Sequence, residues 1–428
     1  MHPGVDRVIS SVWRRESARI VASLARLVRD IGLAEELAQD ALVSALEHWP
    51  ASGIPDNPGA WLMATAKNGA FDRLRRDKLL QQKLQEIGLD LEAQQALVVP
   101  DFVDGLDAAR NDVIGDDVLR LMFTACHPVL STEARIALTL KTVAGLTTQE
   151  IARAFLVPEP TLAQRLVRAK RTLREAAVPF ELPPPEALPE RIDSVLQAVY
   201  LIFNEGYTAT SGTDWLRPAL CDEALRLGRL LARLAPRQPE VHGLVALMEL
   251  QASRTKARTD GDGRPVLLLD QDRSRWDIPL IGRGLDSLAL AESLGGPGGP
   301  AGPYRLQAAI AACHARARTA QQTDWEAIIG LYEELARVAH SPVVELNRAV
   351  AVGMARGPLE ALAIVDEISR DRALQEYQWL PGVRGDLLEK LGRHDEARKE
   401  FERAAALAGN ARERDLMLER ANKNRAGL

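Results

Sequence analysis

Residues 146–174 read LTTQEIARAFLVPEPTLAQRLVRAKRTLR, and this stretch decides the fold of the region around it. Thr147 and Glu150 have the spacing of a capping box, which starts a short helix, and Val157-Pro158 interrupts that helix after at most about three turns. A second helix follows, with apolar residues at helical spacing on one side. The pattern predicts two short helices joined by a turn, a helix-turn-helix.

The second helix of this pair has an apolar face and a basic face. The apolar face consists of Leu162, Leu166, Ala169 and Leu173. Arginine and glutamine on the opposite face are suited to phosphates and to base edges in the major groove, which predicts DNA binding. The alternative is a solvated basic helix in a helical hairpin. The candidate DNA-contacting residues are Thr161, Gln164, Arg165, Arg168 and Arg171.

The charge distribution favours a local DNA contact over a general coating of nucleic acid. The 428 residues carry a net charge of −5, and the pI is near 5.9, which argues against a protein that coats nucleic acid through bulk electrostatic attraction. Residues 161–174 carry five Lys or Arg and no acid, and residues 67–83 carry six against two acids. Residues 84–117 carry nine acids against one Arg and lack clear periodicity, which predicts an acidic linker.

A second candidate DNA surface lies on a helix predicted from Pro58 to about Lys83. The inward stripe of this helix consists of Leu62, Ala66, Ala70 and Leu74. Basic side chains off the stripe are suited to backbone phosphates, and an exposed aromatic can stack on an unpaired base. The alternative is a core tryptophan beside a solvated charged face. The candidate residues are Trp61, Lys67, Asn68, Asp72, Arg73, Arg75 and Arg76.

The composition and the turn signals predict an all-α chain of several domains. Ala, Leu, Arg and Glu dominate, only 4% of residues are aromatic, and strand-like runs are almost absent. A helical pattern from Ser17 to about Leu46 breaks at Asp30-Ile31-Gly32, and PFELPPPEALP ends the second module. The expected divisions are a helical domain at 1–83, the acidic linker at 84–117, a helix-turn-helix domain at 118–178, a proline-rich linker at 179–189, a helical extension at 190–294 and helical repeats at 304–428.

The repeats are inferred from a weak internal similarity near the C-terminus. Ala327, Ala361 and Ala397 occupy equivalent positions, and their spacing is that of tetratricopeptide-type helical hairpins, in which a small residue lets paired helices approach closely. A glycine-rich run at 295–303 predicts a flexible break before them, and residues 259–269 predict one isolated hairpin-like excursion.

The first half of the chain resembles a known family. AEELAQDALVSALEHW at 34–49, NPGAWLMATAKNGAFDRLRRD at 57–77, the acidic linker and the helix-turn-helix follow in the order found in extracytoplasmic-function sigma factors. The resemblance covers residues 15–175, although this chain has Leu156 where the family has Gly in the turn. It implies that the Trp61–Arg76 helix serves the −10 element and the Thr161–Arg171 helix the −35 element. It also implies that core RNA polymerase is bound by Glu36, Gln39 and Asp40.

Three further segments resemble a subgroup of these factors with a long helical, tetratricopeptide-like C-terminal extension. They are LMFTACHPVLSTEAR at 121–135, IARAFLVPEPTLAQRLVRAK at 151–170 and YLIFNEGYTATSG at 200–212. The resemblance implies an alternative sigma factor that binds core RNA polymerase and promoter DNA, with a fused regulatory domain whose repeats bind a protein partner. The alternative is a repeat-scaffold DNA-binding regulator that does not act as a sigma factor.

Catalytic and metal sites are not expected. Cys126-His127 and Cys313-His314 lack the spacing of metal ligands and favour buried structural roles, and the Phe203–Tyr207 segment is interpreted as a turn or an interdomain contact. No phosphate-binding loop and no nucleophile-base set is visible, so neither an enzyme nor a cofactor is predicted. The three widely spaced cysteines, and the lack of a signal peptide or a membrane-spanning run, predict a cytoplasmic protein.

Overall fold

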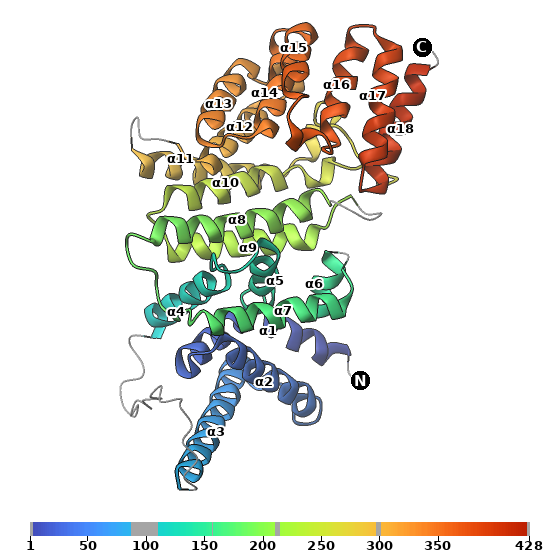
Figure 1. The fold of residues 1–428 in the computed structure, drawn as a ribbon. Coiled ribbons are helices and arrows are strands. Elements are labelled where there is room, and N and C mark those ends of the chain that lie inside the picture. Colours follow the sequence, from blue (N-terminus) through green and yellow to red (C-terminus); the bar gives the residue numbers. More distant parts are fainter. Residues whose placement is uncertain (1–2, 87–109, 156, 210–214, 297–300, 426–428) are drawn as a thin grey trace. The chain divides into compact units, whose positions relative to one another are not determined.

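The structure is a computed structural model that describes residues 3–86, 110–155, 157–209, 215–296 and 301–425 (Figure 1). The described residues form helices and no strand, which confirms the predicted all-α class. Two compact units make up the chain, residues 1–198 and residues 199–428. Leu156 and residues 297–300 of the glycine-rich run lie outside the described residues.

The described residues of the N-terminal unit form seven helices and the first part of an eighth. They are α1 (Pro3–Val28), α2 (Ile31–Ser52), α3 (Pro58–Glu86), α4 (Arg110–Ala125), α5 (Thr132–Thr142), α6 (Thr148–Ala154), α7 (Glu159–Glu175) and α8 (Leu188–Tyr207). The boundary between the two units falls within α8.

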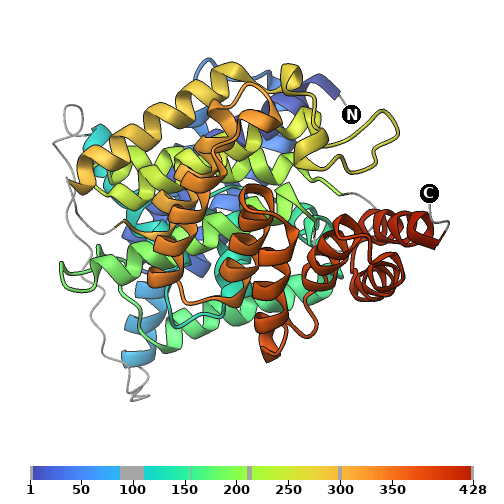
Figure 2. The same cartoon turned by 90° about the horizontal axis from the view of Figure 1, so that it is seen from above.

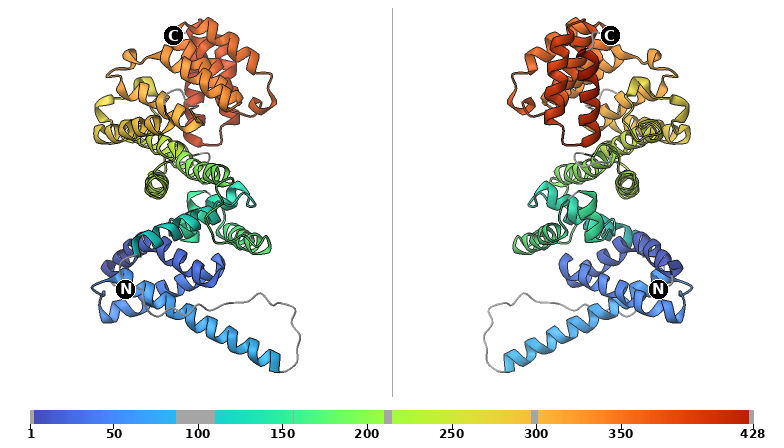
Figure 3. Two further views of the ribbon diagram at one scale, coloured as in Figure 1. Left: turned by 90° about the vertical axis from the view of Figure 1, so that its left-hand side faces the viewer. Right: turned by 90° about the vertical axis from the view of Figure 1, so that its right-hand side faces the viewer.

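Helices α1, α2 and α3 pack against one another around the first core of this unit. The predicted break between α1 and α2 is confirmed, because the Asp30 carboxylate caps α2 by accepting hydrogen bonds from the N–H groups of Gly32 at 2.7 Å and Leu33 at 3.0 Å. The predicted inward stripe of α3 is confirmed at three of its four positions, since Leu62, Ala66 and Ala70 are buried, whereas Leu74 is half-buried. The C-terminal part of α3 projects away from α1 and α2 (Figures 1 and 3).

The predicted acidic linker is wrong at its C-terminal end. Residues 110–117 belong to α4, whereas residues 87–109 lie outside the described residues. Asp117 is only 2% exposed and pairs with Arg120 at 2.7 Å and with Arg26 of α1 at 3.3 Å. The acidic composition suggested solvated chain, but tertiary ion pairs let this carboxylate lie inside a packed helix.

A glycine between α5 and α6 fixes a close approach to α1. Gly145 has φ +72°, a left-handed conformation that favours glycine. A Cβ added there would lie 2.3 Å from the Ser17 hydroxyl oxygen of α1, which leaves no room for a side chain. The turn before the helix-turn-helix is therefore set against α1 by backbone geometry.

Where the structure describes the C-terminal unit, it contains ten further helices and short 3-10 segments. The helices are α9 (Pro218–Leu234), α10 (Pro239–Ala252), α11 (Ile278–Gly295), α12 (Pro303–Arg316), α13 (Trp325–Val338), α14 (Pro342–Ala355), α15 (Pro358–Ile368), α16 (Trp379–Lys390), α17 (His394–Leu407) and α18 (Ala411–Arg425). The 3-10 segments are η1 (Thr255–Ala257), η2 (Leu268–Asp270), η3 (Arg273–Arg275), η4 (Ala320–Gln322) and η5 (Arg372–Leu374). Each helix in the described part of the chain is too short or too polar to span a bilayer.

Helices α12 to α18 form successive packed pairs, as Figures 1 and 2 show, but the predicted register is wrong in the first repeat. Ala361 and Ala397 are fully buried, each as the fourth residue of its helix. Ala327 is exposed, and the fourth residue of α13 is Ile328, which is 1% exposed. The packed position of the first repeat therefore holds an isoleucine in place of alanine. An alignment on shared alanines misses this position.

Two other expectations concern short segments of this unit. The hairpin-like excursion is confirmed as an isolated antiparallel bridge between Thr259 and Pro265. The prediction of a turn at Phe203–Tyr207 is wrong, because this segment is the last part of α8. A Cβ on Gly206 would lie 2.6 Å from the backbone nitrogen of Cys221, so glycine here serves close helix packing and not a turn.

Candidate nucleic-acid interface

The first helix of the helix-turn-helix begins with the capping box that the sequence predicts. Thr147 and Glu150 form the capping box: the Thr147 N–H donates to the Glu150 carboxylate at 2.8 Å, and the Glu150 N–H donates to the Thr147 hydroxyl at 3.1 Å. Helix α6 ends at Ala154, and α7 starts at Glu159 directly after Val157-Pro158. Pro160 therefore lies in the first turn of α7, where a proline is favourable because its missing N–H would have no partner within the helix.

Replacing Thr147 with alanine should lower the local stability of α6 by about 1 kcal/mol, because the cap would lose its hydroxyl acceptor. Hydrogen exchange of the amides of α6 measures this loss. Thr148→Ala is the matched control, since it makes the same change one residue beyond the cap. Equal effects from both substitutions would show that the capping box does not stabilise α6.

Helix α7 separates an apolar face from a polar face. The buried residues are those predicted: Leu162, Leu166, Ala169 and Leu173. They pack on α5 and α6. Of the predicted DNA-contacting residues, one is half-buried, Arg165, and four are exposed: Thr161, Gln164, Arg168 and Arg171.

Two basic residues of α7 bind carboxylates of α2 or its cap. The Lys170 ammonium lies 2.5 Å from the Glu35 carboxylate, which also pairs with Lys141 of α5 at 3.4 Å. Arg174 lies 2.8 Å from Asp30. Burial raises the pKa of Asp30, but the Leu33 N–H and Arg174 outweigh this and hold the pKa below its usual value. These cations fix α7 against α2.

The remaining cations of α7 differ in their surroundings. Arg171 donates to Glu175 on the same helix at 2.6 Å, and both side chains are mostly exposed. Arg165 lies near Glu133 and lowers the pKa of that carboxyl, after the larger effects of the backbone N–H of Glu133 and the hydroxyl of Ser131. In the part of the chain that the structure describes, no ion pair joins Arg168, which is exposed on the same helix. Arg168 is therefore the cation of α7 best suited to an external phosphate or base.

Trp61 lies on the first turn of α3 and is half-buried, not fully exposed. Its ring packs edge-on against the buried Trp49 ring, with centroids 5.4 Å apart, and lies 6.5 Å from the ring of His48. Part of the indole therefore belongs to the contact between α2 and α3.

The other predicted residues of α3 follow its outer surface. Asn68, Asp72, Arg73, Arg75 and Arg76 are exposed, and Lys67 is half-buried. Arg75 lies 3.9 Å from Asp72.

Phe71 is a residue of this surface that sequence reasoning missed. It is 44% exposed and lies beside the inward stripe of α3, directly after Ala70. An exposed aromatic among basic side chains is the feature that stacks on unpaired bases. The signal was present in the sequence, since Phe71 follows Ala70 and so falls off the stripe.

The residues that the resemblance assigns to polymerase binding lie on α2. Glu36 and Asp40 are exposed, and Gln39 is half-buried. Their neighbour Glu35 is only 5% exposed because of its lysine partners. Adjacent glutamates thus have different roles, one inside the unit and one on its surface.

Burial shifts the pKa values of the cysteine and histidine pairs away from neutrality. Burial raises the pKa of the Cys126 thiol to about 11, and burial together with Arg191 lowers the pKa of His127 to about 4. Burial, followed by Arg254, lowers the pKa of His314 to about 3. No group of metal-binding side chains large enough to hold an ion occurs among the described residues.

The fold and the two surfaces define a helix-turn-helix DNA-binding protein with a second basic helix and a helical-repeat unit. Comparison with protein families matches residues 12–79 to sigma-70 region 2 and residues 120–173 to sigma-70 region 4. Residues 191–292 match a family of unknown function, DUF6596.

Similar proteins cover the chain to different extents. An uncharacterized protein of Rhizobium meliloti (strain 1021) is 45% identical over 92% of this chain and 90% of its own length. "Probable ECF RNA polymerase sigma factor SigI" of Mycobacterium tuberculosis is 27% identical over 41% of this chain and 58% of its own length. "ECF RNA polymerase sigma factor SigK" of Mycobacterium sp. (strain KMS) is 27% identical over 39% of this chain and 80% of its own length.

The chain belongs to the extracytoplasmic-function sigma factors and carries an additional C-terminal region. It is an alternative sigma factor that directs transcription initiation, and both conserved regions of such factors are present. The alternative of a scaffold regulator is therefore not favoured.

Proposed function

We propose that three surfaces of the N-terminal unit divide the work of promoter recognition. Helix α7 reads the −35 element, α3 contacts the −10 element and the opened strand, and α2 binds core RNA polymerase. The observation that carries this proposal is the polar face of α7, where Thr161, Gln164 and Arg168 are exposed beside a fully buried apolar stripe. The proposed residues are Thr161, Gln164, Arg165, Arg168 and Arg171 for −35; Trp61, Lys67, Asn68, Phe71, Asp72, Arg73, Arg75 and Arg76 for −10; and Glu36, Gln39 and Asp40 for the polymerase.

The C-terminal unit is proposed to regulate these surfaces. Its repeats form a stack of paired helices, an architecture that offers extended binding surfaces to protein partners. The whole protein is proposed to act in the cytoplasm and to catalyse no reaction of its own.

Run-off transcription with purified core RNA polymerase tests the proposal. The full chain should give a promoter-dependent transcript that disappears when the −35 or the −10 element is scrambled. A shortened chain that ends at Ala198 is assayed in parallel, to compare the activity with and without the C-terminal unit. This endpoint keeps Ser194, which donates to the Cys126 carbonyl at 2.5 Å, and Arg191, which donates to the Phe123 carbonyl. A transcript from neither form, where a known sigma factor works, would contradict the proposed function.

The salt dependence of promoter affinity should report the basic surfaces. Each phosphate that Lys or Arg neutralises releases counterions, so the logarithm of the affinity should fall with the logarithm of salt concentration by about 0.9 per phosphate. Holoenzyme binding to promoter DNA, measured from low to physiological salt, gives this slope. The Arg168→Ala variant should have a shallower slope, and a flat response of the unmodified protein would exclude the basic-helix assignment.

A further inference from the structure

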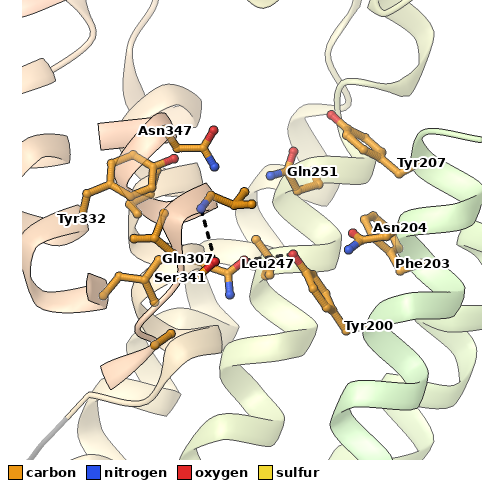
Figure 4. Close-up of a pocket in the computed structure, with 15 residues that line it drawn as sticks. Tyr200, Phe203, Asn204, Tyr207, Leu247, Gln251, Gln307, Tyr332, Ser341 and Asn347 are labelled. Carbon is orange, nitrogen blue, oxygen red and sulfur yellow. Dashed lines mark hydrogen bonds between the residues drawn. The ribbon is translucent and has the colours of Figure 1, made fainter. Parts of the chain in front are cut away.

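A cavity of about 340 Å³ lies in the C-terminal unit among α8, α10, α12, α13 and α14 (Figure 4). All its lining residues fall within 199–428, so the cavity belongs to one unit. None of them is charged, although 26% of the residues in the chain are. The cavity has the size of a small-molecule site, and a charged ligand would find no counter-ion on its wall.

Carboxamide side chains reach this cavity from four different helices. They are Asn204 of α8, Gln251 of α10, Gln307 of α12 and Asn347 of α14. Each carboxamide carries an acceptor and two N–H donors, so together they match a ligand whose groups both donate and accept. Hydroxyl groups have this property.

Two of these carboxamides retain hydrogen-bonding capacity. The Gln307 oxygen accepts from the Tyr200 hydroxyl at 3.0 Å, and its nitrogen donates to the Pro303 carbonyl at 3.2 Å, which fixes its orientation. Within the described residues, no side-chain hydrogen bond involves Asn204 or Asn347. These two lie on opposite sides of the cavity in Figure 4. A ligand between them would meet polar groups from both sides.

Four aromatic rings share the apolar part of the wall with six aliphatic residues. Phe203 and Tyr207 stack on each other with centroids 5.5 Å apart, and the Arg258 guanidinium lies 3.5 Å from the centre of the Tyr207 ring. Those faces are engaged within the protein, and the Tyr200 ring packs edge-on against Tyr304 with centroids 5.4 Å apart. Tyr332 is the fourth ring of the wall. Burial raises the pKa of Tyr332 to about 12, so its hydroxyl stays protonated at neutral pH.

This arrangement distinguishes between kinds of neutral ring compound. A planar base is held most strongly between two aromatic faces, whereas a sugar presents C–H groups on one face and hydroxyls around its edge. The cavity combines uncharged walls, carboxamides on several sides and limited ring surface. We propose that it binds an uncharged sugar, of monosaccharide or disaccharide size.

Calorimetry with the full-length protein tests the proposal, with glucose, galactose, N-acetylglucosamine, maltose, trehalose and sucrose as probes. At least one probe should bind with Kd below about 1 mM. Glucuronate and phosphorylated glucose should bind at least about tenfold more weakly than the best neutral sugar, because burying their charge is not compensated. Adenosine should bind more weakly as well.

Asn347→Ala should raise the Kd of the best sugar about tenfold, because the sugar loses a hydrogen bond to the Asn347 carboxamide and no other group replaces it. Asn347 is exposed on α14, so the substitution leaves the core intact. Asn422→Ala, the same change at an exposed position of α18, is the matched control and should leave the Kd unchanged.

Three results would overturn the proposal: no binding by any neutral sugar of the panel, tighter binding of a charged probe or of adenosine, or an unchanged Kd in Asn347→Ala. Binding is measured without polymerase or DNA, so the result is independent of the promoter-recognition proposal.

Discussion

Replacing Arg168 with alanine should lower the affinity of the holoenzyme for a promoter with an intact −35 element by about tenfold to hundredfold, or about 1–3 kcal/mol. Arg168 is exposed on α7, and no other described residue pairs with it. Affinity measured on the intact promoter and on one with a scrambled −35 element checks the result. In Arg168→Ala, the affinities for the intact promoter and for the scrambled promoter should be nearly equal.

Arg174→Ala is the matched control for this substitution. It removes the same charge from the same helix, but Arg174 is bound to Asp30 at 2.8 Å and does not belong to the proposed DNA-facing set. It should therefore keep the preference for the intact −35 element. Binding of Arg168→Ala to core polymerase, measured by competition, should be unchanged. If core binding is lost together with promoter binding, the role of α7 is structural and not one of recognition.

The contrast between Arg168 and its neighbours shows what the sequence reveals about this site. Helical periodicity alone separates the buried residues of α7 from the polar ones, because that separation depends only on local geometry. It does not identify which cations are already bound within the protein. Lys170 meets Glu35 across 135 residues of sequence, and no local pattern encodes that distance. The apparent basic charge of α7 is thus larger than the charge available to DNA.

Tertiary packing also explains two of the other errors. The start of α4 at Arg110 was missed because a run of acids resembles solvated chain until its arginine partners are known. The repeat register was shifted at Ala327 because the packed position of α13 holds Ile328. The capping box at Thr147, by contrast, depends on residues three apart and was predictable. The missed ion pairs join residues far apart in the sequence, whereas the turn expected at Phe203–Tyr207 is a local error, since this segment is helical.

The buried carboxylate of Glu35 provides the prediction with the largest effect on stability. Removing both of its cations, as Lys141→Met with Lys170→Met, should lower the free energy of unfolding around α2 and α7 by about 3–5 kcal/mol. Glutamate is short and its side chain is only 7% exposed, so it cannot reach water as a lysine can. Hydrogen exchange of the amides of α2 and α7 in the full-length protein measures the change locally.

Adding Glu35→Leu to the double variant distinguishes an unpaired charge from lost packing. With the carboxylate replaced by an apolar side chain of similar size, most of the lost stability should return, because the cost comes from an uncompensated buried charge. If the triple variant stays as unstable as the double variant, the lysines contribute through their aliphatic packing instead. Recovery of stability in the triple variant would show that α7 packs against α2 without the ion pair between Lys170 and Glu35. This matters for DNA recognition because Arg168 lies on the same helix as Lys170. Arg168→Ala in that background should then still abolish most of the −35 preference.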